Sequence, residues 1–148
     1  MTNTSFRVGH IDHVEVFVPD QYEAARWYQQ VLGLTILPDY EHWASNGPLM
    51  ISSDGGTTML ALFQGEPRGQ RPTAGHHRVA FRVDGASFLD FLQHATTVQI
   101  YDGHGHPIEE LSIVDHELSW SVYFCDPYGN RYEVTTYDYQ FVAEMHRN

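Results

Sequence analysis

The chain has 148 residues, 42% of them hydrophobic, which is enough to bury the core of one domain. Its 19 acidic residues outnumber the 8 basic ones, and the net charge of −11 argues against binding DNA or RNA, whose phosphates would be repelled. No apolar run approaches the length of a membrane span and the first residues do not form a signal peptide, so we expect no membrane contact. The single cysteine, Cys125, cannot form an internal disulfide and fits a cytoplasmic location.

The first half of the chain has the pattern of one βαβββ unit. Residues 9–18 (GHIDHVEVFV) alternate as a strand that places His13 and Glu15 on one face. Asp20 follows as a helix N-cap, and Gly33 ends the amphipathic helix that it begins. Three strand-like segments complete the unit, at residues 34–37, 48–52 and 57–64.

The pattern restarts after a stretch rich in proline and glycine. Residues 76–83 (HHRVAFRV) alternate as a strand, Asp84 caps a second helix, and a strand-like segment follows at 108–114. A hairpin then joins strands 119–125 and 131–137 through the tight turn DPYGN. Because HVEVFVPD and RVAFRVDG open the two halves alike, we expect a duplicated half-domain. Module one would span about residues 9–64, the linker 65–75, module two about 76–137 and a C-terminal tail 138–148.

Two such modules predict a single α+β domain over residues 1–148. We expect the paired βαβββ modules to form a curved, cup-like mixed sheet with the helices outside. The alternating strands would then direct His13, Arg78, Tyr123 and Glu133 into the cup.

These inward-facing residues suggest a metal site. Two histidines and one carboxylate with open positions suit iron(II) or a similar divalent ion. His13 and Glu133 would supply two ligands, but alignment of the modules puts Arg78 at the place of the third. His77 reaches the cup only if its strand begins with a bulge, and otherwise a guanidinium replaces a ligand.

Plainer interpretations exist for the same residues. His13 can be a structural histidine with hydrogen bonds inside the cup, and the polar face of the hairpin can simply be solvated. His104 and His106 lie in a glycine-rich loop and are more typical of surface residues than of ligands.

At these residues the chain resembles the vicinal oxygen chelate superfamily, which includes glyoxalases, bleomycin- and fosfomycin-resistance proteins and extradiol dioxygenases. IDHVEVFVPD with WYQQVLGL looks like the first module, and HRVAFRVDG and DPYGNRYEV look like the two ends of the second. The stretch from Val114 to Glu133 also resembles the extradiol dioxygenase signature. By that resemblance Glu133 and His13 would bind iron, Tyr123 would hydrogen-bond a substrate oxygen, and His116 would be an acid/base or oxygen-stabilising residue.

The resemblance implies a metal-dependent enzyme of dioxygenase type that acts on a small vicinal-oxygen substrate of the catechol kind. The metal would be Fe(II), with Mn(II), Ni(II) or Zn(II) as alternatives, held by His13, His77 and Glu133. His116 and Tyr123 would take part in catalysis. The chain departs from the pattern at Arg78, and the segment TTMLALFQ lacks a further histidine that those dioxygenases carry.

Two other functions remain open. One is a metal-free binding protein of the bleomycin-resistance type, in which Arg78, Met59 and Phe63 would contact an aromatic or anionic ligand. The other is a glyoxalase-like isomerase or lyase. In each case we expect a cytoplasmic homodimer, because members of this superfamily often dimerise through their modules.

Overall fold

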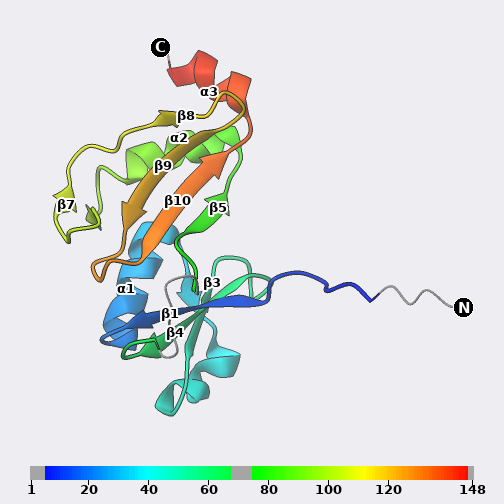
Figure 1. Ribbon diagram of the computed structural model, residues 1–148, viewed down its shortest axis with the longest axis vertical. Coiled ribbons are helices and arrows are strands. Elements are labelled where there is room, and N and C mark those ends of the chain that lie inside the picture. Colours follow the sequence, from blue (N-terminus) through cyan, green and yellow to red (C-terminus); the bar gives the residue numbers. More distant parts are fainter. Residues whose placement is uncertain (1–5, 68–74, 147–148) are drawn as a thin grey trace, which may run out of the picture.

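The computed structural model describes residues 6–67 and 75–146. Most of the expected linker at 65–75 and both chain ends lie outside these residues. The chain forms two separate mixed sheets, one from each half, with helices packed against them (Figure 1). None of the helices in this part of the chain is long and apolar enough to span a membrane.

The N-terminal half forms a four-stranded sheet, here called sheet A. Its strands lie in the order β1 (His13–Val18), β4 (Met59–Gln64), β3 (Leu49–Ser52) and β2 (Thr35–Ile36). β1 and β4 run parallel, whereas the other neighbours are antiparallel. A 3-10 helix, η1 (Pro38–Ser45), follows β2 and was not expected from the sequence.

The C-terminal half forms a second mixed sheet, here called sheet B. Its strands lie in the order β5 (Val79–Arg82), β10 (Arg131–Thr136), β9 (Trp120–Cys125), β6 (Ile100–Tyr101) and β7 (Pro107–Ile108), and β8 (Val114–Asp115) also pairs with β9. As in sheet A, the first strand pairs in parallel with the last. The α+β fold with two βαβββ modules is confirmed.

Three stretches differ from the sequence-based expectation. β5 begins at Val79, so His76 and His77 precede the strand instead of standing in it. The physical reason is that β5 pairs with β10, whose first paired residue is Tyr132, and no strand lies beside the two histidines. The strand expected at 108–114 is divided between β7 and β8, and the C-terminal tail contains helix α3 (Tyr139–His146).

The helix ends follow the capping rules. The Asp20 side chain accepts a hydrogen bond from the Glu23 N–H at 3.0 Å and caps α1 (Gln21–Leu32), which ends at Gly33 with a φ of 70°. Asp84 caps α2 (Gly85–His94) by accepting from the Ser87 N–H at 2.8 Å. Both N-caps and the glycine C-cap are therefore confirmed.

Helix α1 lies between the two sheets and joins their cores. The Trp27 ring packs 6.4 Å from that of Phe124 on β9, and the Tyr28 ring packs 5.6 Å from that of Tyr132 on β10. One hydrophobic cluster contains core residues of both sheets: Val16, Val18, Leu60, Leu62, Val122, Phe124, Tyr132 and Val134. Because both sheets turn these residues toward a shared core, each sheet has one face that this core does not cover.

A buried polar network fixes α1 against sheet B. The Tyr28 hydroxyl donates to Asp126 Oδ2 at 2.5 Å and lies 2.7 Å from the Tyr132 hydroxyl. Asp126 is fully buried, and its Oδ1 accepts from the N–H groups of Tyr128 and Asn130 at 2.9 Å each. Burial raises the pKa of Tyr28 and of Tyr132 well above that of a free tyrosine, so both phenols are neutral near pH 7.

We expect Tyr28→Phe to lower the free energy of unfolding by about 1–3 kcal/mol, because it leaves the buried Asp126 without its phenolic donor. Tyr22→Phe is the matched control, since Tyr22 is exposed and its hydroxyl contacts only Glu41. That control should change stability by about 0.5 kcal/mol or less. Denaturant titration of both variants measures the difference, and equal values for the two would contradict the role of the network.

The same tyrosines predict loss of stability in alkali. In the unfolded chain Tyr28 ionises near pH 10, whereas in the folded chain its raised pKa keeps it protonated. Above about pH 10 the unfolded state therefore binds fewer protons than the folded state, and the free energy of unfolding falls as pH rises. Denaturant titrations across this range should show a steeper fall for the native chain than for Tyr28→Phe.

Candidate small-molecule site

The face of sheet B that points away from the core is lined by polar side chains. On β9 and β10 these side chains alternate with core residues, and the register pairs Tyr123 with Glu133 and Ser121 with Thr135. Residues next to these strands add a guanidinium and an imidazole. This surface is called the polar face, and it consists of Arg78, His116, Ser121, Tyr123, Glu133 and Thr135.

Tyr123 is at the centre of the polar face and contacts His116. The His116 Nε2 atom lies 2.8 Å from the Tyr123 hydroxyl, and the two rings are perpendicular. A backbone hydrogen bond from His116 N–H to Ser119 O, together with the left-handed φ of 70° at Glu117, holds the turn that presents the imidazole. A phenol and an imidazole at this distance can pass a proton between them.

Arg78 lies over the ring of Tyr123. Its Cζ atom is 4.7 Å from the ring centroid, which is the geometry of a cation–π contact. Within residues 6–67 and 75–146, Arg78 forms no ion pair with a carboxylate, Glu133 included. The guanidinium is thus oriented by the tyrosine and not neutralised by the glutamate.

Glu133 is half-buried and has one oxygen engaged. The Ser121 hydroxyl donates to its Oε2 at 2.8 Å, while the Thr135 hydroxyl donates to the Trp120 carbonyl at 3.1 Å. No described residue hydrogen-bonds its Oε1, and no described buried side-chain oxygen lacks a partner, so Oε1 is open to solvent. The alternation in the sequence did not reveal that Ser121 fixes the carboxylate of Glu133.

The predicted metal ligands lie in three places. His13 stands on β1 of sheet A, where its Nδ1 is 2.8 Å from Asp12 Oδ2 and its Nε2 is 3.4 Å from Glu15 Oε2. The hydrogen bond with Asp12 is the main cause that raises the His13 pKa above its usual value. His77 precedes β5, and Glu133 is on sheet B. Across the described part of the chain, no three His, Cys, Asp or Glu side chains could hold one metal ion.

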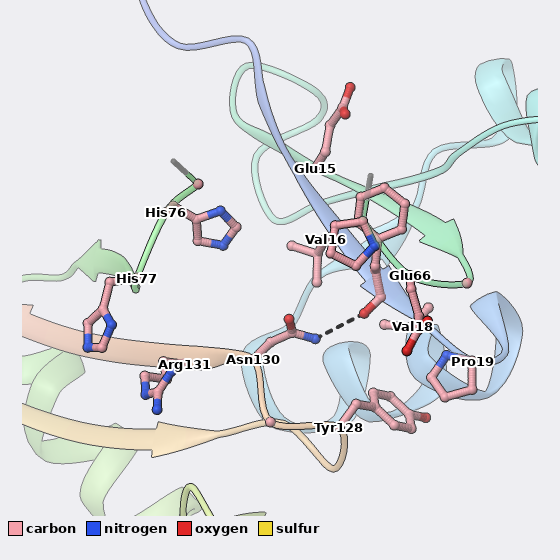
Figure 2. A pocket seen from close by; sticks show the side chains of 15 residues that line it. Glu15, Val16, Val18, Pro19, Glu66, His76, His77, Tyr128, Asn130 and Arg131 are labelled. Atoms are coloured by element: carbon pink, nitrogen blue, oxygen red, sulfur yellow. Dashed lines mark hydrogen bonds between the residues drawn. The ribbon is translucent and has the colours of Figure 1, made fainter. Parts of the chain in front are cut away.

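A cavity of about 760 Å³ lies where β1 approaches the β9–β10 turn (Figure 2). His76 and His77, which precede β5, and Arg131 of β10 line it on one side, and Glu15 of β1 lines it on the other. The Asn130 side-chain amide donates to the Phe17 carbonyl at 3.3 Å and links the two walls. His77 therefore faces the junction of the modules.

Met59 and Phe63 belong to the outer face of sheet A. Met59 is buried in a small cluster with Met50 and Ala61, and Phe63 packs at its edge and stacks on Phe17 with ring centroids 5.5 Å apart. The predicted ligand-binding residues thus form an apolar set on sheet A and a polar set on sheet B. Within one chain the two sets are not brought together.

Several solved structures have a fold similar to that of this chain. Oxidase ChaP-H2 is 21% identical with a TM-score of 0.61, covering 88% of this chain and 94% of that one. A putative glyoxalase family protein from Bacillus anthracis is 22% identical with a TM-score of 0.60, covering 90% and 99%. The fosfomycin resistance protein FosX from Mesorhizobium loti is 19% identical with a TM-score of 0.59, covering 88% and 93%. At these identities the similarity establishes the fold alone.

Sequence comparison gives the family. No curated protein matches the chain. The family model described as Glyoxalase/Bleomycin resistance protein/Dioxygenase superfamily matches residues 10–134, which include most of both modules and every residue of the polar face except Thr135. The chain therefore belongs to the glyoxalase/bleomycin resistance protein/dioxygenase superfamily, the vicinal oxygen chelate proteins.

Proposed function

We propose that this chain is a metal-independent small-molecule binding protein whose ligand site is the polar face of sheet B. The observation that carries the proposal is the Arg78 guanidinium over Tyr123, 4.7 Å from the ring centroid. Arg78 stands where the comparison of the two modules expects a second histidine ligand. A permanent positive charge there disfavours a divalent cation nearby and attracts the oxygens of a ligand.

Three groups beside Arg78 support binding of a polar aromatic molecule. The hydroxyl of Tyr123 and the imidazole of His116 can donate or accept a hydrogen bond, and Glu133 Oε1 is an open acceptor. A planar ligand can lie against Arg78 and Tyr123 while its oxygens reach these groups.

A homodimer would close the site. Arg78 and His116 of the polar face are exposed in one chain, whereas the outer face of sheet A has the half-buried rings of Phe63 and Phe17 beside the buried Met59. β1 and β5 are edge strands with unpaired backbone groups, which favours pairing between copies. In a two-fold dimer sheet A of one copy would cover sheet B of the other, and Met59 and Phe63 would then contact the ligand as predicted.

We expect protein stripped of metal by a chelator to remain dimeric and to bind hydroxylated aromatic ligands. Light scattering after size exclusion measures the dimer, and calorimetry measures the binding. Tyr123→Ala should abolish binding because it removes both the ring beneath Arg78 and the partner of His116. Tyr137→Ala is the control, since Tyr137 follows the last residue of β10 and contacts Arg82, whereas Tyr123 contacts Arg78. Binding that appears only after a divalent ion is added would overturn the proposal.

A metal-dependent enzyme of dioxygenase type is the second candidate. The 2.8 Å contact between His116 and Tyr123 favours it, because these are the two residues that the extradiol signature assigns to acid/base chemistry and to a substrate oxygen. Members of the superfamily commonly use divalent metals. The donors of one chain do not fit such an ion, and a site would have to combine His13 of one copy with Glu133 of the other.

Anaerobic loading with Fe(II), followed by exposure to oxygen and a catechol, separates the two candidates. We expect no oxygen uptake above that of free Fe(II), because Arg78 takes the place of a ligand. Oxygen uptake that Glu133→Gln abolishes would instead establish the dioxygenase function. The same protein loaded with Mn(II), Ni(II) or Zn(II) tests a glyoxalase-like isomerase or lyase.

A further inference from the structure

We propose that Arg78 takes the place of a metal ion in this site, and that the ligand is an aromatic carboxylate with a hydroxyl group on the ring carbon next to the one that bears the carboxylate. This inference rests on the proposed function and names its ligand class. It follows from the donors and acceptors that the polar face presents.

Arg78 presents a planar set of N–H donors. A guanidinium carries five such donors and no acceptor, and it stays charged at every physiological pH. The contact with Tyr123 places Cζ 4.7 Å from the ring centroid, and no described residue accepts a hydrogen bond from the Arg78 N–H groups. Since no described carboxylate pairs with Arg78, the guanidinium can take both oxygens of a ligand carboxylate in a bidentate pair.

Tyr123 and His116 add a second contact for the carboxylate. When His116 Nε2–H donates to the Tyr123 oxygen, the phenolic proton is free to donate to the ligand. The ligand carboxylate would then accept from the guanidinium and from the phenol. Both donors lie on the same side of the polar face, so they act on one group of the ligand.

Glu133 selects the neighbouring hydroxyl. Glu133 is the direct cross-strand partner of Tyr123, which puts their Cβ atoms about 5 Å apart. Ser121 already holds Oε2, so a single acceptor, Oε1, remains for the ligand. A hydroxyl brings one proton to this one acceptor, whereas an ammonium would bring three and a second carboxylate would be repelled.

Arg82 provides a matched control, since it is the last residue of β5 whereas Arg78 directly precedes that strand. Its Cζ atom lies 4.6 Å from the ring centroid of Tyr137, nearly the same contact that Arg78 makes with Tyr123. No hydrogen bond joins Tyr137 to a described histidine or glutamate, so Arg82 has the stacked guanidinium without the neighbouring groups. If ligand binding depends on the groups around Arg78, replacing Arg78 must therefore weaken binding and replacing Arg82 must not.

Calorimetry with 2-hydroxybenzoate, benzoate and catechol, all in the presence of a chelator, tests the inference. We expect 2-hydroxybenzoate to bind about tenfold or more tightly than either of the others, because only it satisfies both Arg78 and Glu133. Arg78→Gln should weaken binding of 2-hydroxybenzoate and of benzoate about tenfold or more. Arg78→Lys should restore little of the lost affinity, because an ammonium lacks the planar pair of N–H donors of a guanidinium. Glu133→Gln should remove most of the preference for 2-hydroxybenzoate over benzoate.

Arg82→Gln should leave all three affinities unchanged, and circular dichroism should show that every variant is folded. Equal affinity for the three ligands, or equal effects of Arg78→Gln and Arg82→Gln, would overturn the inference and leave metal-independent binding intact. Binding of any ligand only in the presence of added metal would instead overturn the proposed function itself.

Discussion

The hydrogen bonds around Asp126 determine how the two halves of this chain are arranged. A carboxylate that is fully buried costs several kcal/mol unless its oxygens are paired. Here the Tyr28 hydroxyl from α1 and the Asn130 amide and two N–H groups from the β9–β10 turn supply the partners. Only one placement of α1 against the hairpin satisfies them all. The helix of the first module is therefore fixed to the sheet of the second.

This placement explains why the candidate site is an outer surface. With α1 between them, both sheets direct their apolar side chains to one core, and each sheet is left with one face that this core does not cover. On sheet B that face carries Arg78, Tyr123 and Glu133, and on sheet A it carries Met59 and Phe63. Within a chain, the polar groups that could bind a ligand and the apolar side chains that could pack against it thus lie on different sheets. This separation supports a site formed by two copies.

Local rules predicted much of the fold. Asp20, Asp84 and Gly33 cap helices because capping depends on residues a few positions apart, and alternation placed Tyr123 and Glu133 on one face because a strand has a period of two. His77 could not be placed in this way, since β5 begins only where β10 offers a partner. The contact of Tyr28 with Asp126 spans 98 positions, and no periodicity in the sequence reports it. The arrangement of the modules, and with it the separation of His13 from Glu133, could therefore not be predicted from the sequence patterns.

The parallel pairing of first and last strands has a further consequence for how such a scaffold can change. Val14 of β1 lies opposite Leu60, and Val79 of β5 lies opposite Tyr132, so the two modules use the same internal framework. The residues just before these positions, His13 and Arg78, have side chains outside the hydrophobic cluster that the modules share. Each copy of the duplicated unit can therefore acquire its own chemistry by a single replacement, an imidazole in one and a guanidinium in the other, while the interior that both inherit is undisturbed.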